Sequence, residues 1–228
     1  MDQLVVSELF GPTFQGEGPS SGRVAGFVRL GRCNLSCTFC DTPYTWDWST
    51  HDPAVELSRL AVGEVLARLD AMDVDLVVVT GGEPLLQARP LAALLQGIRA
   101  RGWEVEVETN GTLPPLEPGG LVDRYNVSPK LANSGIERER RYHPDVLRAF
   151  EATGRAVFKF VVGDARELDE VAEMVSDCGL DQVFVMPEGT DPAEVTAKLR
   201  QLAGPVLARR WNLTNRFHIL LWGDRRGV

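Results

Sequence analysis

The sequence predicts an α/β fold with a mostly parallel sheet, built either as an open sheet or as a partial (β/α) barrel. Short continuous apolar runs bounded by turn residues alternate along the chain with amphipathic helical periods. Strands that are buried on both faces have such runs, as parallel strands do. Because strand and helix alternate, we expect right-handed crossovers that place helices against the sheet.

The individual elements follow from the two patterns. Apolar runs predict strands over 25–30, 76–79, 156–162 and 183–186. Apolar residues that recur at intervals of three and four predict helices over 62–69, 91–98, 168–175 and 195–202. No repeat or long linker interrupts this series, so residues 1–228 are expected to form a single domain.

Residues 103–108 alternate strictly between apolar residues, Trp103, Val105 and Val107, and glutamates, and this strand has two interpretations. In the first, the strand lies half-exposed at the edge of the sheet. In the second, it lies inside a barrel, and its three glutamates point into a polar lumen. Arg29 and Lys159 favour the second, because each interrupts an apolar strand and can neutralise a carboxylate inside.

Composition limits the class of protein. The chain has 228 residues, of which 44% are hydrophobic and 25% charged, as in soluble globular proteins. No apolar run approaches the 18 or more residues of a membrane span, and the first residues lack a basic segment followed by an apolar core, so a cytoplasmic location without membrane contact is expected. The formal charge of -8 repels phosphate backbones, which argues against nucleic acid and favours a small-molecule substrate.

Three of the four cysteines, Cys33, Cys37 and Cys40, form a C-x3-C-x2-C pattern in the loop after the first predicted strand. Three thiolates in one loop can hold three irons of a 4Fe-4S cluster and leave the fourth iron open to a ligand. The alternative is a zinc site with His51 as its fourth ligand. Cys178 falls on the apolar face of a predicted helix, which favours a buried small hydrophobic residue.

A second motif, Thr80-Gly81-Gly82-Glu83-Pro84, follows the strand over 76–79. Its glycines allow a close approach of the backbone to a ligand, although such a turn is by itself common. Together with Phe39 directly before Cys40, the two motifs resemble the radical S-adenosylmethionine (SAM) superfamily. The resemblance implies that SAM binds the open iron, and that an electron from the cluster cleaves it to a radical that abstracts hydrogen from the substrate.

Within that superfamily the sequence is similar to the 7-carboxy-7-deazaguanine synthases. The matching segments occur in order at 14–18, 29, 40–42, 80–84, 108–111, 128–130 and 218. The resemblance implies a carbon–nitrogen lyase that contracts the ring of 6-carboxy-5,6,7,8-tetrahydropterin and releases ammonia, in queuosine-type deazapurine synthesis. It also implies a shortened barrel of about six mostly parallel strands.

The resemblance assigns roles to individual residues. The pterin contacts would be Phe14, Gln15, Gly16, Arg29, Thr80 and His218. The SAM contacts would be Phe39, Cys40, Asp41, Gly82, Glu108, Ser128, Pro129, Lys130, Met186, Pro187 and Glu188. Arg29 suits the pterin carboxylate because guanidinium and carboxylate pair through two hydrogen bonds. His218 lies in an apolar run, so a buried structural histidine is an equal alternative.

Thr42 matches a position where the family places an oxygen ligand to Mg²⁺, which we expect to bind together with the substrate. Independently of the family, most of these residues directly follow predicted strands, where parallel α/β folds carry their chemistry. Further expectations are a homodimer, an electron donor such as flavodoxin, and a solvated charge run over 136–142.

Two other functions share part of this evidence. Glycyl-radical activating enzymes have the same cysteine motif, but their substrate gives no reason for the segment at 14–18 together with Arg29. A binding module stabilised by zinc in the cysteine loop would leave the turn at 80–84 without a role.

Overall fold

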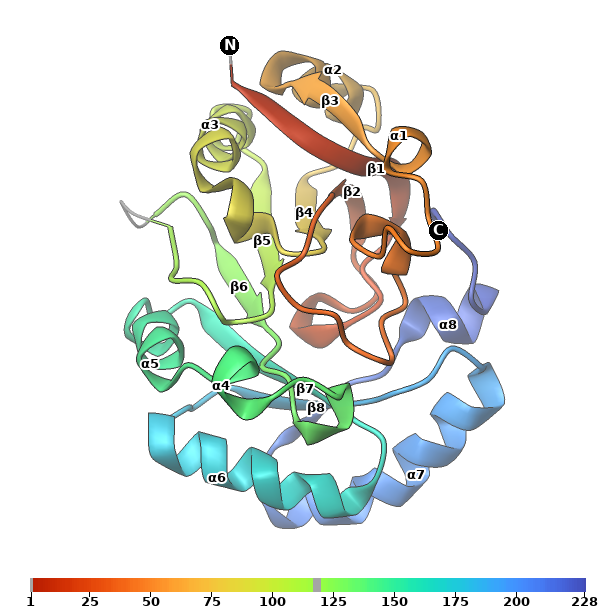
Figure 1. The fold of residues 1–228 in the computed structure, drawn as a ribbon, viewed down its shortest axis with the longest axis vertical. Coiled ribbons are helices and arrows are strands. Elements are labelled where there is room, and N and C mark those ends of the chain that lie inside the picture. The colour runs from red at the N-terminus through yellow and green to blue at the C-terminus, as the bar shows by residue number, and fades with distance from the viewer. Residues whose placement is uncertain (1, 117–119) are drawn as a thin grey trace.

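The computed structural model describes residues 2–116 and 120–228 and arranges them around one nine-stranded sheet (Figure 1). The strands are β1 Gln3–Phe14, β2 Val24–Leu30, β3 Ser58–Ala61, β4 Leu76–Gly81, β5 Glu104–Thr109, β6 Arg124–Val127, β7 Ala156–Val162, β8 Val183–Pro187 and β9 Asn212–Leu213. Their order across the sheet is β3-β1-β2-β4-β5-β6-β7-β8-β9. All neighbours from β2 to β9 pair in parallel, whereas β1 runs antiparallel to β2 and β3. The α/β class with a mostly parallel sheet is confirmed, and the sheet is open between β3 and β9.

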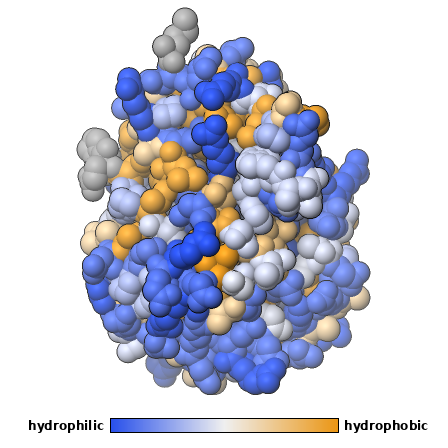
Figure 2. Space-filling view, in the orientation of Figure 1, coloured by the Kyte–Doolittle hydropathy of each residue, from blue (hydrophilic) through white to orange (hydrophobic). Residues whose placement is uncertain are grey.

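Helices surround the curved sheet, most of them on its outer side (Figure 1). They are α1 Pro53–Glu56, α2 Val62–Asp70, α3 Ala88–Arg99, α4 Arg138–Arg141, α5 Pro144–Ala152, α6 Leu168–Cys178, α7 Pro192–Ala208 and α8 Phe217–Trp222. On the face seen in Figure 2, hydrophilic residues cover most of the surface, as expected for helices that turn their apolar sides toward the sheet. Within the described ranges, no helix combines the length and the apolar character that a bilayer span requires.

Burial on both faces of the sheet explains why the central strands have continuously apolar sequences. Val77 and Val79 of β4 lie in the main core between sheet and helices, while Leu76 and Val78 pack with Phe27 on the other face. A strand that is buried on both faces has no polar positions, so its sequence is continuously apolar. Cys178 lies in the main core, as its position on the apolar helix face predicted.

Strand β5 is not an edge strand, because it lies between β4 and β6. Its valines, Val105 and Val107, are fully buried in the main core. On the opposite face, Glu106 accepts hydrogen bonds from Arg124 and from Ser20. The interpretation with glutamates pointing into a polar interior therefore describes this strand, except that Glu104 lies at the surface beside Arg23.

Two features of the fold differ from the sequence-based expectations. The long strand β1 was not predicted, because its polar and apolar residues do not alternate regularly. Its pairing with β2 is correspondingly irregular, since the register shifts twice. The charge run over 136–142 was predicted to be solvated, but Arg141 is buried. Its guanidinium donates to the carbonyl oxygens of Ile136 and Lys130 and pairs with Glu170, which satisfies the charge away from water.

Truncating a fully buried ring should destabilise this core. Phe150 of α5 is 0% exposed and meets the ring of Tyr125 edge-on at 5.1 Å. Phe150→Ala is expected to lower the free energy of unfolding by about 3–5 kcal/mol, because it removes apolar contacts and leaves a cavity. Urea unfolding followed by circular dichroism measures the change, and the exposed Val55→Ala serves as a control that should stay within about 0.5 kcal/mol.

Candidate active site

The parallel strands end at one large cavity, and its wall contains most of the residues predicted from the sequence. Those lining it are Phe14, Gln15, Arg29, Cys33, Cys37, Phe39, Cys40, Asp41, Thr42, Thr80, Gly82, Glu108, Ser128, Lys130, Met186, Glu188 and His218. They come from β1, β2, β4, β5, β8 and α8 and from the loops after the strands. The fold therefore brings together segments that span nearly the whole sequence.

Three predicted residues, Gly16, Pro129 and Pro187, do not line the cavity. Gly16 does not line the cavity because the ring of His218 lies directly against it. A Cβ atom at Gly16 would lie 2.0 Å from Nδ1 of His218. The carbonyl of Gly16 also accepts a hydrogen bond from the backbone N–H of Phe217 at 2.8 Å. Gly16 thus fixes the position of His218 in the wall of the cavity instead of offering a side chain.

The loop after β2 carries the three cysteines and lies directly against the glycine turn at the end of β4. A Cβ at Gly81 would come within 2.1 Å of the Leu30 carbonyl oxygen, and one at Gly82 within 2.1 Å of the Arg32 carbonyl oxygen. Backbone hydrogen bonds join the two segments, from Gly82 to Leu30 at 3.0 Å and from Glu83 to Arg32 at 2.8 Å. Only glycine allows this contact.

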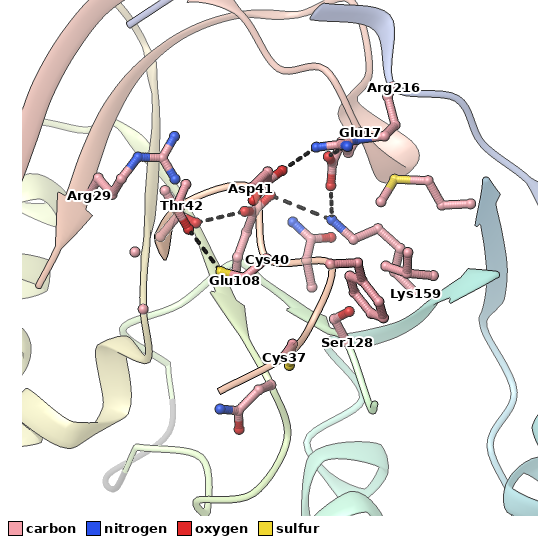
Figure 3. A pocket seen from close by; sticks show the side chains of 18 of the residues that line it. Glu17, Arg29, Cys37, Cys40, Asp41, Thr42, Glu108, Ser128, Lys159 and Arg216 are labelled. Carbon is pink, nitrogen blue, oxygen red and sulfur yellow. Dashed lines mark hydrogen bonds and ion pairs between the residues drawn. The ribbon is translucent and has the colours of Figure 1, made fainter. Parts of the chain in front are cut away.

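The three cysteines of this loop are free thiols that line the cavity and are partly exposed, and Figure 3 shows two of them, Cys37 and Cys40. Burial raises the pKa of the Cys33 thiol to about 11 and that of the Cys37 thiol above its ordinary value. No three His, Cys, Asp or Glu side chains in the described ranges converge on a point where one ion could bind. A 4Fe-4S cluster needs no such point, because each thiolate binds a different iron, so these residues fit a cluster.

A network of charges around the buried Lys159 and Arg216 lines another part of the cavity and reaches Asp41, the residue after Cys40 (Figure 3). Glu17 pairs with Lys159 and, at 3.3 Å, with Arg216, and Arg216 also pairs with Asp41. Arg216 donates in addition to the carbonyl oxygen of Gly189 at 2.6 Å. Burial alone would raise the pKa of Glu17, but the charges of Lys159 and Arg216 outweigh it and hold this pKa well below its ordinary value.

Glu108 connects this network to the predicted pterin contacts. Its carboxylate accepts hydrogen bonds from Gln15 Nε2 at 3.2 Å and from Thr80 Oγ1 at 2.8 Å, and it lies 3.8 Å from Lys159 Nζ. Burial lowers the pKa of Lys159, but Glu17 and Glu108 together raise it above its ordinary value. The ammonium group therefore stays charged inside the protein, as the lumen interpretation of the sequence requires.

Arg29 lies apart from this network on its own side of the cavity (Figure 3). Its Nε donates to Glu8 Oε2 at 2.7 Å, and its guanidinium carbon lies 5.5 Å from the centre of the Phe10 ring. Tyr44 donates to the same carboxylate at 2.8 Å, and Arg226 donates to its other oxygen at 2.5 Å. Glu8 is thus held from three sides and in turn orients Arg29.

Several charged residues in the cavity wall or directly behind it were not predicted from the sequence. Arg216 lies in an irregular segment between β9 and α8, where no periodicity marks a buried charge. Glu8 belongs to β1, whose pattern gave no signal. Glu17 lies in the segment 14–18 that resembles the family, but no role was predicted for it. The buried charge of Lys159 nevertheless requires a carboxylate partner, and Glu17 is that partner.

Comparison with known proteins identifies the family of the chain. Residues 28–163 match the radical SAM superfamily. The 7-carboxy-7-deazaguanine synthase of Pyrobaculum aerophilum is 40% identical over 227 residues, which cover 97% of this chain and 96% of the relative. The synthase of Hyperthermus butylicus is 39% identical over 225 residues, covering 96% and 92%. The chain belongs to the 7-carboxy-7-deazaguanine synthase family of radical SAM enzymes.

The fold supports the same family. The crystal structure of QueE from Escherichia coli matches with a TM-score of 0.73 at 26% identity and covers 95% of both chains. A 7-carboxy-7-deazaguanine synthase is a radical SAM enzyme that uses a 4Fe-4S cluster and SAM on a small-molecule substrate, and the cysteine loop fits that use. Family membership decides against the glycyl-radical activating enzyme and the zinc-stabilised module that the cysteine pattern alone had left open.

Loss of one loop cysteine should remove the cluster. Cys37→Ala is expected to abolish stable binding of the four irons, because three thiolates must each bind one iron. Iron and sulfide analysis after anaerobic reconstitution measures this, together with the visible absorption of the cluster. Cys178→Ala is the matched control and should retain all of the iron, since Cys178 lies in the main core. An intact cluster in Cys37→Ala would contradict the assignment.

Breaking the buried ion pair should destabilise the protein in a pH-dependent way. Glu17→Gln is expected to lower the free energy of unfolding by about 3–5 kcal/mol at pH 7, because it leaves Lys159 without its main partner. The pKa of Glu17 is lowered from 4.5 in the folded state, so wild type keeps this stabilisation above about pH 4.5 and loses it as the pH falls further. Urea unfolding across this pH range tests both statements.

The matched control for this experiment is Glu104→Gln. Glu104 makes an ion pair with Arg23, but the side chain of Glu104 is 55% exposed. A surface pair of this kind contributes at most about 1 kcal/mol. Equal effects of the two substitutions would mean that burial of the Glu17 pair does not matter.

Proposed function

We propose that the chain converts 6-carboxy-5,6,7,8-tetrahydropterin to 7-carboxy-7-deazaguanine with release of ammonia, as a radical SAM lyase of deazapurine synthesis. One observation carries this proposal: the cavity lined by the loop cysteines is also lined by Arg29, Gln15 and Thr80, which the sequence resemblance implies as pterin contacts. A substrate held by these three residues would lie beside the cluster, which is where a radical reaction requires it.

Arg29 is proposed to bind the pterin carboxylate. Only its Nε is used by Glu8, and within the described residues its two terminal nitrogens make no hydrogen bond. These nitrogens can donate to both oxygens of a carboxylate. Phe10 lies against the guanidinium and limits its movement.

The polar edge of the pterin is proposed to meet Gln15 and Thr80, which both donate hydrogen bonds to Glu108. His218 closes this side, with Phe14 and the backbone at Gly16 next to it. Burial lowers the pKa of His218, so the ring is neutral at pH 7 and can donate or accept a hydrogen bond. A neutral histidine suits an uncharged heterocycle.

SAM is proposed to bind between the cysteine loop and the ends of β6 to β8. When bound to the cluster, SAM supplies the radical that abstracts hydrogen from the substrate. Lys130 is held by the carbonyl and hydroxyl oxygens of Ser128, at 3.0 and 2.9 Å, and keeps this turn in place. The other proposed contacts are Phe39, Cys40, Asp41, Gly82, Glu108, Pro129, Met186, Pro187 and Glu188. Pro129 and Pro187 would act only by shaping the backbone of their segments.

Thr42 is proposed to contribute an oxygen to Mg²⁺. Its Oγ1 lies 3.7 Å from Cys40 Sγ, at the edge of the cavity. A single hydroxyl is a weak site, because Mg²⁺ prefers several oxygen ligands. The remaining ligands would come from the substrate and water, so the metal should bind together with the pterin.

The wider setting of the enzyme also remains a proposal. We expect residues 1–228 to act as one catalytic domain in a cytoplasmic homodimer, reduced by a donor such as flavodoxin and independent of nucleic acid. The excess of acidic residues and the content of the cavity support a small-molecule enzyme. Light scattering of the purified protein tests the dimer.

Anaerobic incubation with the carboxy-tetrahydropterin, SAM, Mg²⁺ and a reductant tests the function. We expect 7-carboxy-7-deazaguanine and ammonia in equal amounts, detected by mass spectrometry and an ammonia assay. A protein with a full cluster that binds SAM but forms no deazaguanine would contradict the proposed substrate.

Arg29→Ala should weaken pterin turnover without affecting the cluster. We expect kcat/KM to fall by about 100-fold, because two hydrogen bonds to a charged group are lost. Iron content should stay unchanged, since Arg29 is not a ligand. Arg23→Ala, at the surface beside Glu104, is the control and should keep its activity. Loss of the cluster in Arg29→Ala would show a structural role instead.

A further inference from the structure

We propose that Trp46 tunes the reduction potential of the iron–sulfur cluster through a hydrogen bond from its indole N–H to the sulfur of Cys40. Nε1 of Trp46 lies 3.2 Å from Cys40 Sγ, which is the shortest hydrogen bond to a cysteine sulfur in the described part of the chain. An indole N–H can only donate, so the sulfur is the acceptor. The inference depends on the cluster and not on the pterin chemistry.

The backbone around Trp46 fixes the indole in this position. Residues 43–45 form a single 3-10 turn, and the N–H of Trp46 donates to the carbonyl oxygen of Pro43 at 3.0 Å. Thr45 is fully buried, and its hydroxyl donates to the carbonyl oxygen of Thr42 at 2.8 Å. The carbonyl oxygen of Thr45 accepts from the backbone of Arg32 at 2.6 Å, which ties the turn to the start of the cysteine loop.

The other sulfurs have longer contacts. Cys33 accepts from the backbone of Leu35 at 3.5 Å and from Asn110 Nδ2 at 3.9 Å. Among the cysteines of the loop, Cys40 therefore accepts the shortest hydrogen bond, the one from Trp46. The indole is also part of the cavity wall, so its removal would affect the cluster from the side where SAM is proposed to bind.

The expected direction of the effect follows from charge. Reduction adds one electron to the cluster, and part of the added charge resides on the cysteine sulfurs. An N–H donor stabilises a more negative sulfur more strongly, so it favours the reduced cluster and raises the potential. Without this donor, the cluster should become harder to reduce.

The test compares Trp46→Phe with the matched variant Trp48→Phe. Trp48 lies in the same loop, but it is 41% exposed. The midpoint potential is measured by anaerobic redox titration monitored by electron paramagnetic resonance, without SAM. For Trp46→Phe we expect about a tenfold smaller equilibrium constant for one-electron reduction, which corresponds to a potential about 59 mV lower. Trp48→Phe should have the wild-type potential.

A wild-type potential in Trp46→Phe with its full iron content would overturn the proposal, as would an equal shift in both variants. Should Trp46→Phe fail to bind a cluster, pulsed magnetic resonance of the Trp48→Phe protein carrying ¹⁵N-indole tryptophan decides the question. Coupling of one indole nitrogen to the reduced cluster supports the hydrogen bond, and its absence overturns it. Neither measurement involves pterin turnover, so a failure of the proposed function would not be mistaken for a failure of this inference.

Discussion

The active site depends on one close backbone contact, between the cysteine loop and the glycine turn that follows β4. The backbone hydrogen bonds from Gly82 to Leu30 and from Glu83 to Arg32 seat the start of the loop on the end of the parallel sheet. Any side chain at Gly81 or Gly82 would overlap a carbonyl oxygen of the loop. The turn therefore acts first by letting the cysteine loop approach the sheet, and contact between Gly82 and SAM would be its second role.

A buried carboxylate within the turn stabilises this contact by accepting hydrogen bonds from the end of the neighbouring strand, β5. Glu83 is fully buried, and burial raises its pKa, although hydrogen bonds to it act in the opposite direction. It accepts from the hydroxyl of Thr109 and from the backbone N–H groups of Asn110 and Leu85. Glu83 thus joins the turn after β4 to the end of β5. The same Asn110 reaches the sulfur of Cys33, so two adjacent strand ends together support the first cysteine of the loop.

The sequence predicted the parts of this site that depend on local patterns. Continuous apolar runs located β4, β7 and β8, since burial on both faces leaves no polar positions. Lys159 was recognised as an interior charge, because a lysine in such a run requires a buried carboxylate. Arg216 could not be found in the same way, since its partners Glu17 and Asp41 are distant in the chain and its own segment is irregular. Charges paired across long sequence separations leave no periodic signal.

The arrangement of charge around the cavity suits two ligands of opposite sign. On one side, the ion pairs among the described residues join three carboxylates, Glu17, Asp41 and Glu108, to two cations, Lys159 and Arg216, which leaves one negative charge in excess within this network. On the other side, Glu8 and Glu56 balance the charges of Arg29 and Arg226, but Glu8 occupies only Nε of Arg29 and leaves the terminal nitrogens of this lining residue to a ligand. A sulfonium cofactor is favoured near the first group, and a substrate carboxylate is favoured at the guanidinium of Arg29. Because burial strengthens both effects, the protein can orient cofactor and substrate in one cavity before any reaction begins.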